Sequence, residues 1–450
     1  MRGFLASSIG VTCAAALALP LAAAPTTATA TTGRPAPAPA GGHAPGSTQS
    51  LPLAPLAHDR ATDTPGTAEQ GVPRRDTRRF SLVGVVWDDP AAELHGTVQV
   101  RTRSTATGAW SPWQDLETHH TDHAADPGTP ESTSGRVRGA TAPLWVGESD
   151  GVEVRVRPLD GTGDQDTASA ASPLPAGLRL ELVDPGEGDP GEAAPPRTST
   201  TPVALTGTPR TPAPPLGATE IPALSRAQTV AGLLARGTGT LTEQQRAKPY
   251  VGPRPGITTR RGWGADERLR EKKFVYTKKV KVAFVHHTAT GNNYTCKQAP
   301  SVIRSIYRYH VNSMGWRDIG YNFLVDKCGK IYEGRAGGVS KPVLGAHTMG
   351  FNSDSTGIAV LGTYSSKKPS SAAVKAVAKL TAWKLGLHGM NPRGKTYLKS
   401  GGGNLYRKGK NVRLNVISGH RDGFLTSCPG KQLYGKLGTA RSSAAKYQGR

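Results

Sequence analysis

A proline-rich stretch at residues 185–222 divides the chain into two parts of different composition. Each proline fixes φ and removes a backbone donor, so such a stretch stays extended and semi-rigid. Residues 1–250 carry 20 Lys and Arg against 25 Asp and Glu, a net charge of −5. Residues 251–450 carry 36 against 8, a net charge of +28. We therefore expect at least two folded units, and the overall charge of +23 belongs to the second.

The first 30 residues are typical of a secretory signal peptide. An early Arg2 precedes an apolar, Ala-rich run and then small residues, with candidate cleavage sites near Ala24 and Ala30. A membrane anchor is the alternative, but Pro20 and Pro25 interrupt the run before it reaches the ~20 apolar residues of a spanning helix. No later segment is apolar enough to span a bilayer. The sequence predicts a secreted protein, extracellular or cell-wall associated, with no stable membrane insertion.

The rest of the first half divides into two regions. Residues 31–78 are rich in Pro, Ala, Thr and Gly and poor in large apolar side chains, so we expect them to be disordered. Residues 79–184 contain short alternating runs separated by Gly, Pro and Asp, which predicts a small all-β, sandwich-like domain of unknown function. We assign no catalytic cluster to it. His119, His120 and His123 lie in a polar stretch and are interpreted as solvated loop residues rather than metal ligands.

The second half predicts an α/β domain at 253–437, between a connecting segment at 223–252 and a basic tail at 438–450. Residues 280–287 are nearly all apolar, which is typical of a strand buried on both faces. In residues 301–311 apolar side chains recur every three or four positions, which predicts a helix. Further patterns predict a hairpin at 321–333, strands at 356–362 and 415–420, and a helix at 372–385. We expect a central mixed β-sheet flanked by helices.

Histidines end two of these predicted strands, and a cysteine follows the second. His286 closes the first strand, His420 closes the last, and Cys428 lies eight residues beyond. Two imidazoles and one thiolate with an open fourth position form a plausible catalytic zinc site. In that interpretation Cys428 is a ligand, and Cys296 and Cys328 pair in a disulfide. The alternative is a free buried cysteine with two core histidines, and the spacing alone does not separate the two.

Six motifs in the second half resemble a known family. They are WGAD at 263–266, FVHHTAT at 284–290, GWRDIGYNFLVD at 315–326, IYEGRAGG at 331–338, GAHTMGFNSDSTGIAVLG at 345–362 and GHRDGFLTSCPG at 419–430. Together they resemble the peptidoglycan recognition protein family, which is similar to the phage T7 lysozyme-type N-acetylmuramoyl-L-alanine amidases. The likeness covers about 40% of the chain. It implies a zinc amidase that cleaves the bond between the lactyl group of muramic acid and the L-alanine of the stem peptide.

The resemblance also implies which residues perform the chemistry. The zinc ligands of the family match His286, His420 and Cys428, and the implied cofactor is one Zn²⁺. Tyr321 matches the tyrosine that faces the metal and assists catalysis. Thr426 lies two residues before the cysteine ligand, and we expect it to orient groups by hydrogen bonding rather than to act as an acid.

Two further positions are expected to bind substrate. His347 matches a histidine that lines the groove in the family, and Arg335 belongs to the EGR motif. Family members commonly continue this motif with Gly-Trp or Asn-Phe, a pair that helps to discriminate the third stem-peptide residue. Here Ala336 and Gly337 occupy those positions. The choice between diaminopimelate and lysine stem peptides therefore stays open.

Three function classes fit the sequence to different degrees. Family members that only bind peptidoglycan lack one or more zinc ligands, so the complete set here favours an enzyme over a non-catalytic binding protein. A nucleic-acid binder would need aromatic side chains interleaved with the basic ones, and none stands out. We expect the basic half to hold the protein on peptidoglycan and anionic wall polymers instead. The oligomeric state is not predicted.

Overall fold

The computed structural model describes residues 46–56, 69–118, 123–159, 173–187, 217–235 and 242–450. The expected signal peptide and most of the proline-rich stretch lie outside these residues. All described residues belong to one compact unit, which extends from 43 to 450. No helix among them is long and apolar enough to cross a bilayer.

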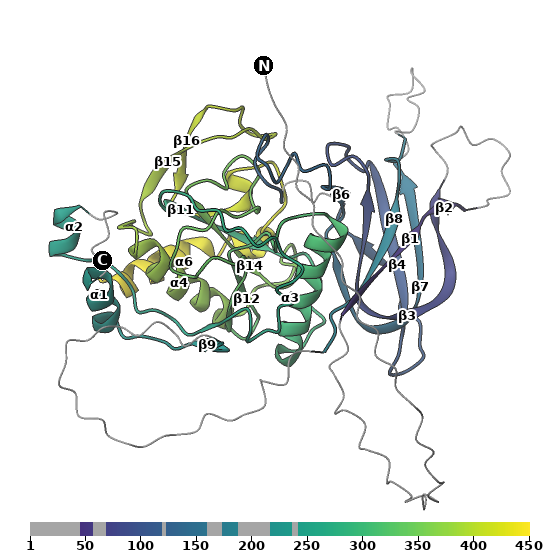
Figure 1. Cartoon of the computed structure of the whole chain (residues 1–450), viewed down its shortest axis with the longest axis horizontal. Helices are drawn as coiled ribbons and strands as arrows, with labels where there is room; N and C mark the ends of the chain where they lie inside the picture. The colour runs from purple at the N-terminus through teal and green to yellow at the C-terminus, as the bar shows by residue number, and fades with distance from the viewer. Residues whose placement is uncertain (1–45, 57–68, 119–122, 160–172, 188–216, 236–241) are drawn as a thin grey trace, which may run out of the picture. The chain divides into compact units, whose positions relative to one another are not determined.

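Eight antiparallel strands form the first domain, drawn in purple to blue-green in Figure 1. They are β1 (Ser47–Pro52), β2 (Ala54–Pro55), β3 (Gln70–Trp87), β4 (Gly96–Ser104), β5 (Gln114–Leu116), β6 (Gly139–Ala140), β7 (Leu144–Pro158) and β8 (Arg179–Asp184). The strand order is β1-β8-β3-β7-β4-β5, and β2 and β6 pair with β3. The predicted all-β domain is confirmed, and its strands are linked into one hydrogen-bonded sheet.

The expected disorder of residues 31–78 is wrong for the part that the structure describes. Strands β1 and β2 and the first half of β3 lie in this segment. The ladder between β1 and β8 is continuous from Ser47 opposite Asp184 to Pro52 opposite Arg179. Backbone pairing along an existing strand orders residues that carry few apolar side chains, and composition alone does not reveal it.

The second half of β3, residues 80–87, is buried on both faces. Val83, Val85 and Trp87 point into the core of the β-rich domain, beside apolar residues of β4, β7 and β8. Leu82 and Val86 belong to a different cluster, which they share with the second domain. Because alternate side chains of a strand point to opposite faces, the second domain covers the outer face of this sheet.

A seven-stranded mixed sheet forms the centre of the second domain, as expected. Its members in spatial order are β17 (Ile417–Gly419), β11 (Val282–His287), β14 (Ser355–Val360), β12 (Phe323–Val325), β13 (Ile331–Glu333), β10 (Ile257–Thr258) and β9 (Glu220–Ile221). A separate hairpin, β15 (Lys395–Lys399) and β16 (Asn411–Asn415), was not predicted. The helices are α1 (Arg226–Ala235), α2 (Glu243–Ala247), α3 (Ala299–Arg308), α4 (Ser371–Gly386), α5 (Lys431–Tyr434) and α6 (Leu437–Gln448).

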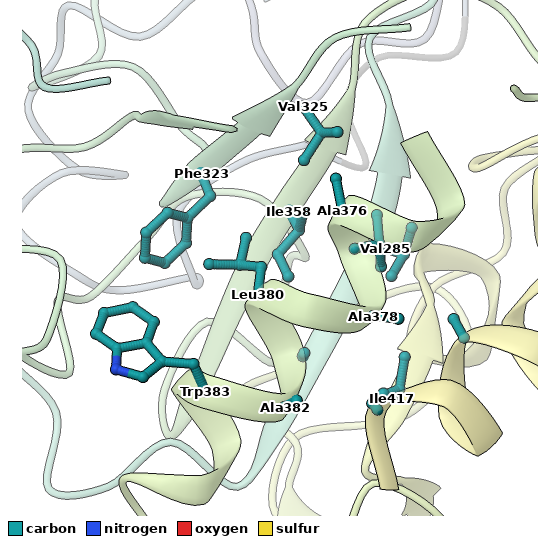
Figure 2. Packing of buried hydrophobic residues seen from close by; sticks show 14 of the residues in the cluster. Val285, Phe323, Val325, Ile358, Ala376, Ala378, Leu380, Ala382, Trp383 and Ile417 are labelled. Carbon is teal, nitrogen blue, oxygen red and sulfur yellow. The ribbon is translucent and has the colours of Figure 1, made fainter. Parts of the chain in front are cut away.

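Helices cover both faces of this sheet. Figure 2 shows Leu380 and Trp383 of α4 beside Phe323 and Ile358 of the strands. Leu324, which lies between Phe323 and Val325 in β12, points the other way and packs with α3. The sheet is therefore a buried layer between α4 and α3, and this explains its apolar strands.

The second domain extends further at both ends than the predicted bounds of 253 and 437. Strand β9 completes the sheet, and Ile221, Leu233 and Val251 enter the α4 core, so the expected connecting segment at 223–252 is part of the fold. The expected basic tail at 438–450 is most of helix α6. Its Ala440 and Ala444 are buried, and small side chains at this spacing let α6 pack closely on α4, although the segment has little apolar character overall.

The structure contains the expected disulfide. Cys296, just before α3, is bonded to Cys328 in the β12–β13 turn. Their Cα atoms are 6.2 Å apart, and the two residues are 32 positions apart in sequence. Replacing both cysteines by serine should lower the free energy of unfolding by about 3–4 kcal/mol, because the unfolded chain regains loop entropy. Urea denaturation of the oxidised protein, the reduced protein and the double variant checks this. Equal midpoints for oxidised and reduced protein would contradict it.

Candidate metal centre

Four buried side chains converge at one end of the α/β sheet. They are His286, His420, Cys428 and His123, and their ligand atoms all lie within 4.8 Å of one another. The His286 Nδ1 atom is 3.3 Å from His123 Nε2 and 3.8 Å from Cys428 Sγ. Cys428 Sγ is 3.7 Å from His123 Nε2. A set of this size and chemistry could hold one metal ion.

The sheet topology brings the first two histidines together. Strands β11 and β17 are parallel neighbours, with Val285 opposite Gly419. His286 and His420 therefore follow at the same edge of the sheet, at the carboxyl ends of both strands, although 134 positions separate them in sequence. The loop after β17 folds back toward His420, because the amide of Arg421 donates to the carbonyl of Cys428. This turn places the Cys428 thiol beside both rings.

The environment keeps His286 in the form that binds a metal. Burial, followed by the neighbouring His420 and His123 rings, lowers the pKa of His286 well below its ordinary value. A neutral imidazole retains the lone pair that a metal needs. The Nε2 atom of His286 lies 3.4 Å from the hydroxyl of Thr348, and its Nδ1 atom faces the cluster. Imidazole and thiol donors at this density fit Zn²⁺, which prefers nitrogen and sulfur ligands.

The interpretation of His123 as a solvated loop residue is wrong. It belongs to the β-rich domain, but its side chain is only 4% exposed and its ring lies 4.5 Å from that of His420. The residue is 163 positions from His286, in a polar segment with no periodicity, so no local pattern points to it. His119 and His120 lie outside the described residues.

Tyr321 and Thr426 each contact a residue of the cluster. Tyr321 is buried directly before β12, and its ring centre is 5.6 Å from that of His286. Thr426 accepts a hydrogen bond from the backbone amide of Cys428 at 3.1 Å. The Tyr321 ring therefore packs beside the histidines of the cluster, and the Thr426 hydroxyl bonds to the backbone of the cysteine loop.

His347 is fully buried, so it does not line an open groove in this structure. Its ring centre is 5.2 Å from that of His286, and its Nδ1 atom lies 3.1 Å from the hydroxyl of Thr348. Burial, followed by His420 and Arg335, lowers the pKa of His347 well below its ordinary value. The neutral ring and the Thr348 hydroxyl orient His286 from behind, as a neighbouring hydrogen-bonding group does for many metal ligands.

Arg335 is also buried, and a carboxylate already occupies its guanidinium. The two carboxylate oxygens of Glu131, in the β-rich domain, accept hydrogen bonds from Arg335 at 2.9 and 2.8 Å. Burial alone would raise the pKa of Glu131, but the charge and hydrogen bonds of Arg335 outweigh it and hold that pKa below its ordinary value. No local pattern in the sequence points to Glu131.

Comparisons with known proteins find similar families for both domains. A family model described as N-acetylmuramoyl-L-alanine amidase matches residues 276–431, and one described as Rv3811 N-terminal galactose-binding domain-like matches 34–176. Peptidoglycan-recognition protein SC2 of Drosophila simulans is 31% identical over 185 residues, which are 41% of this chain and 85% of that protein.

One further protein sequence and one solved structure are also similar to this chain. A human N-acetylmuramoyl-L-alanine amidase is 35% identical over 127 residues, which are 27% of this chain and 21% of that protein. A solved structure of peptidoglycan recognition protein-LE in complex with tracheal cytotoxin, a monomeric diaminopimelic acid-type peptidoglycan, is 29% identical. It aligns with 41% of this chain and 92% of its own, with a TM-score of 0.32.

Proposed function

Since this chain belongs to the peptidoglycan-recognition protein family, we propose that it is a secreted, zinc-dependent N-acetylmuramoyl-L-alanine amidase that hydrolyses the amide bond between N-acetylmuramic acid and L-alanine. The observation that carries the proposal is the convergence of His286, His420 and Cys428. These three donors match the ligands implied by the family motifs. The two histidines lie at strand ends beside the buried Tyr321, and the cysteine lies in the loop that follows β17. The disulfide supports export to an oxidising compartment.

The residues of the centre would have different roles in amide hydrolysis. When bound by His286, His420 and Cys428, Zn²⁺ would supply a Lewis acid that polarises the amide carbonyl. Thr348 and His347 hold the His286 ring in place. The Tyr321 phenol is a hydrogen-bond donor that can stabilise the negative charge developing on the carbonyl oxygen.

The test is to incubate purified peptidoglycan with the protein, with and without a zinc chelator, and to identify the products by mass spectrometry. Because His123 also lies in the cluster, both the wild-type chain and the His123→Ala variant are assayed. Release of stem peptides with a free L-alanine amino terminus, lost with chelator and restored by zinc, supports the proposal. A non-catalytic binding protein is the alternative, and wall binding without new amino termini in either chain would establish it.

Tyr321→Phe should lower kcat about 100-fold and leave the zinc content unchanged. Removing one donor to a developing oxyanion typically costs this much, and phenylalanine keeps the ring packed against His286. Turnover of a soluble muropeptide together with metal analysis checks the prediction. A parallel loss of zinc would mean that Tyr321 supports the fold of the centre, and unchanged kcat would remove it from the mechanism.

The basic second half should bind anionic wall polymers. Its +28 charge, counted from 36 Lys and Arg against 8 Asp and Glu, attracts polyanions over a range that salt shortens. We expect co-sedimentation with purified walls to weaken steadily as sodium chloride rises, while hydrolysis of a soluble muropeptide changes much less. Binding that does not respond to salt would contradict an electrostatic attachment.

A further inference from the structure

One stretch of the β-rich domain crosses the candidate metal centre. It is the segment between β5 and β6, described from His123 to Arg138, and we call it the 123–138 segment. Three of its side chains reach the α/β domain: His123 at the metal cluster, Asp126 at the backbone of Gly350, and Glu131 at Arg335. These contacts join residues about 160 to 225 positions apart. These contacts are therefore long-range tertiary contacts that local sequence patterns do not predict.

The position of His123 matches that of a fourth metal ligand. Its Nε2 atom approaches both His286 and Cys428, and its ring packs edge-on against His420. Catalytic zinc sites keep three protein ligands and one open position, whereas sites with four protein ligands are closed. A metal held by all four side chains would have no free position for water or for an amide carbonyl.

The carboxylate of Glu131 blocks a second part of the site. It forms a two-pronged pair with Arg335, and one of its oxygens also accepts from the Arg317 amide at 3.2 Å. Both side chains are at least 92% buried, so the pair excludes water and any competing anion. An acidic group of a ligand could reach this guanidinium only after Glu131 had left.

Asp126 fixes the segment between these two points. One of its carboxylate oxygens accepts from the Gly350 amide at 2.8 Å and from the Asn352 side chain at 2.7 Å. Asn352 in turn accepts from the amides of His347 and Thr348, which stand behind His286. The segment is thus tied to the same loop that orients a metal ligand.

The segment is not packed on all sides. A cavity of about 490 Å³ lies along it, lined by Pro127, Ser132 and Val137 on one side and by Met314, Trp316 and Phe424 on the other. Residues beside a cavity lose fewer dispersion contacts when they move away. Fewer apolar contacts therefore oppose its displacement than in a close-packed core, and the polar anchors carry more of the attachment.

We propose that the 123–138 segment is a built-in inhibitor of the metal centre, in which His123 is the fourth metal ligand and Glu131 occupies Arg335. The folded chain is therefore latent, and substrate enters only when the segment is displaced. The identity of the excluded substrate as peptidoglycan rests on the proposed function. The closure of the metal centre does not depend on it.

The first test measures closure without any activity. Cobalt-substituted wild-type protein, His123→Ala and the control His95→Ala are titrated with azide, and visible absorption reports anion binding to the metal. His95 lies in the same domain and is exposed. We expect azide to bind His123→Ala at least about 10-fold more tightly than the other two, and zinc to bind it at least about 10-fold more weakly. Equal azide affinities in wild type and His123→Ala would overturn the proposal.

The second test uses Glu131→Gln, which keeps the shape of the side chain and removes its charge. This variant still tests the proposal if His123→Ala does not fold. Loss of a buried partner should release the segment, raise azide affinity toward that of His123→Ala, and raise hydrolysis about 10-fold or more. If azide distinguishes the variants but no chain hydrolyses peptidoglycan, the closure stands and the proposed function fails. If wild type binds azide and hydrolyses as fast as both variants, the proposed function stands and the inhibitor is refuted.

Discussion

Replacing Cys428 by alanine should abolish peptidoglycan hydrolysis, lowering it at least about 1000-fold, and should remove most of the bound zinc. Cys428 supplies the only thiol of the cluster, and a catalytic zinc ion needs three protein ligands. In the His123→Ala background, loss of the thiol leaves only His286 and His420, and two imidazole donors hold zinc weakly. His420→Ala should give the same result, because each ligand is needed by the whole site.

Metal analysis by mass spectrometry and muropeptide turnover check this prediction together. The measurements are made in the His123→Ala background as well, so that closure of the centre does not hide activity. His388→Leu is the matched control. His388 is a buried histidine of the same domain, and neither of its ring nitrogens has a hydrogen-bond partner within the described part of the chain.

Burial, followed by Lys384, lowers the pKa of His388 to about 3, so its removal deletes no charge. We expect the control to keep its zinc. If Cys428→Ala retained both zinc and turnover, the assignment of the thiol as a ligand would be refuted.

Gly84→Leu should separate the β-rich domain from α3. Gly84 lies in β3, and a Cβ atom there would come within 2.3 Å of the Tyr309 hydroxyl oxygen. Tyr309 is fully buried and donates to the carbonyl of Thr141 at 3.1 Å, so it has no room to move aside. Overpacking of a rigid contact typically costs about 1–3 kcal/mol, and a whole leucine at this distance should cost at least that much.

Calorimetry and hydrogen exchange report the separation. We expect the unfolding of the wild type to involve both domains together, and that of Gly84→Leu to divide into two transitions, with faster exchange in α3 and in the 123–138 segment. Gly438→Leu is the control, because Gly438 is exposed and an added Cβ there meets nothing within 4 Å. A single transition with unchanged exchange in Gly84→Leu would show that the contact does not hold the domains together.

The same variant connects stability with function. Leu82 and Val86 of β3 share a core with α3, so the sheet that carries the 123–138 segment is attached through apolar contacts far from the metal ligands. If the segment inhibits the centre, loosening this attachment should raise azide binding and hydrolysis as His123→Ala does. Gly84→Leu therefore tests the inhibitor without altering any residue of the metal centre.

The sequence alone identified the centre of the α/β domain. Near-continuous apolar strands, helical periodicity and polar residues at strand ends are local patterns, and they lead directly to the mixed sheet and to His286 and His420 at its edge. Cys428 followed from its place after the last strand as one of two open interpretations, and the family motifs favoured it and added Tyr321 and Thr426. His286, His420 and Tyr321 follow from short-range signals because each lies in or next to the strand that positions it.

Tertiary structure alone decided what covers that centre. Helix α6 and strand β1 have weak apolar patterns and are ordered by neighbours that composition does not show. His123 and Glu131 lie in a polar segment with no periodicity. Their roles are evident only from their partners in the other domain, which are 163 and 204 positions away. A contact of this kind depends on how the surfaces of two folded domains meet. It therefore cannot be predicted from the local sequence of either domain.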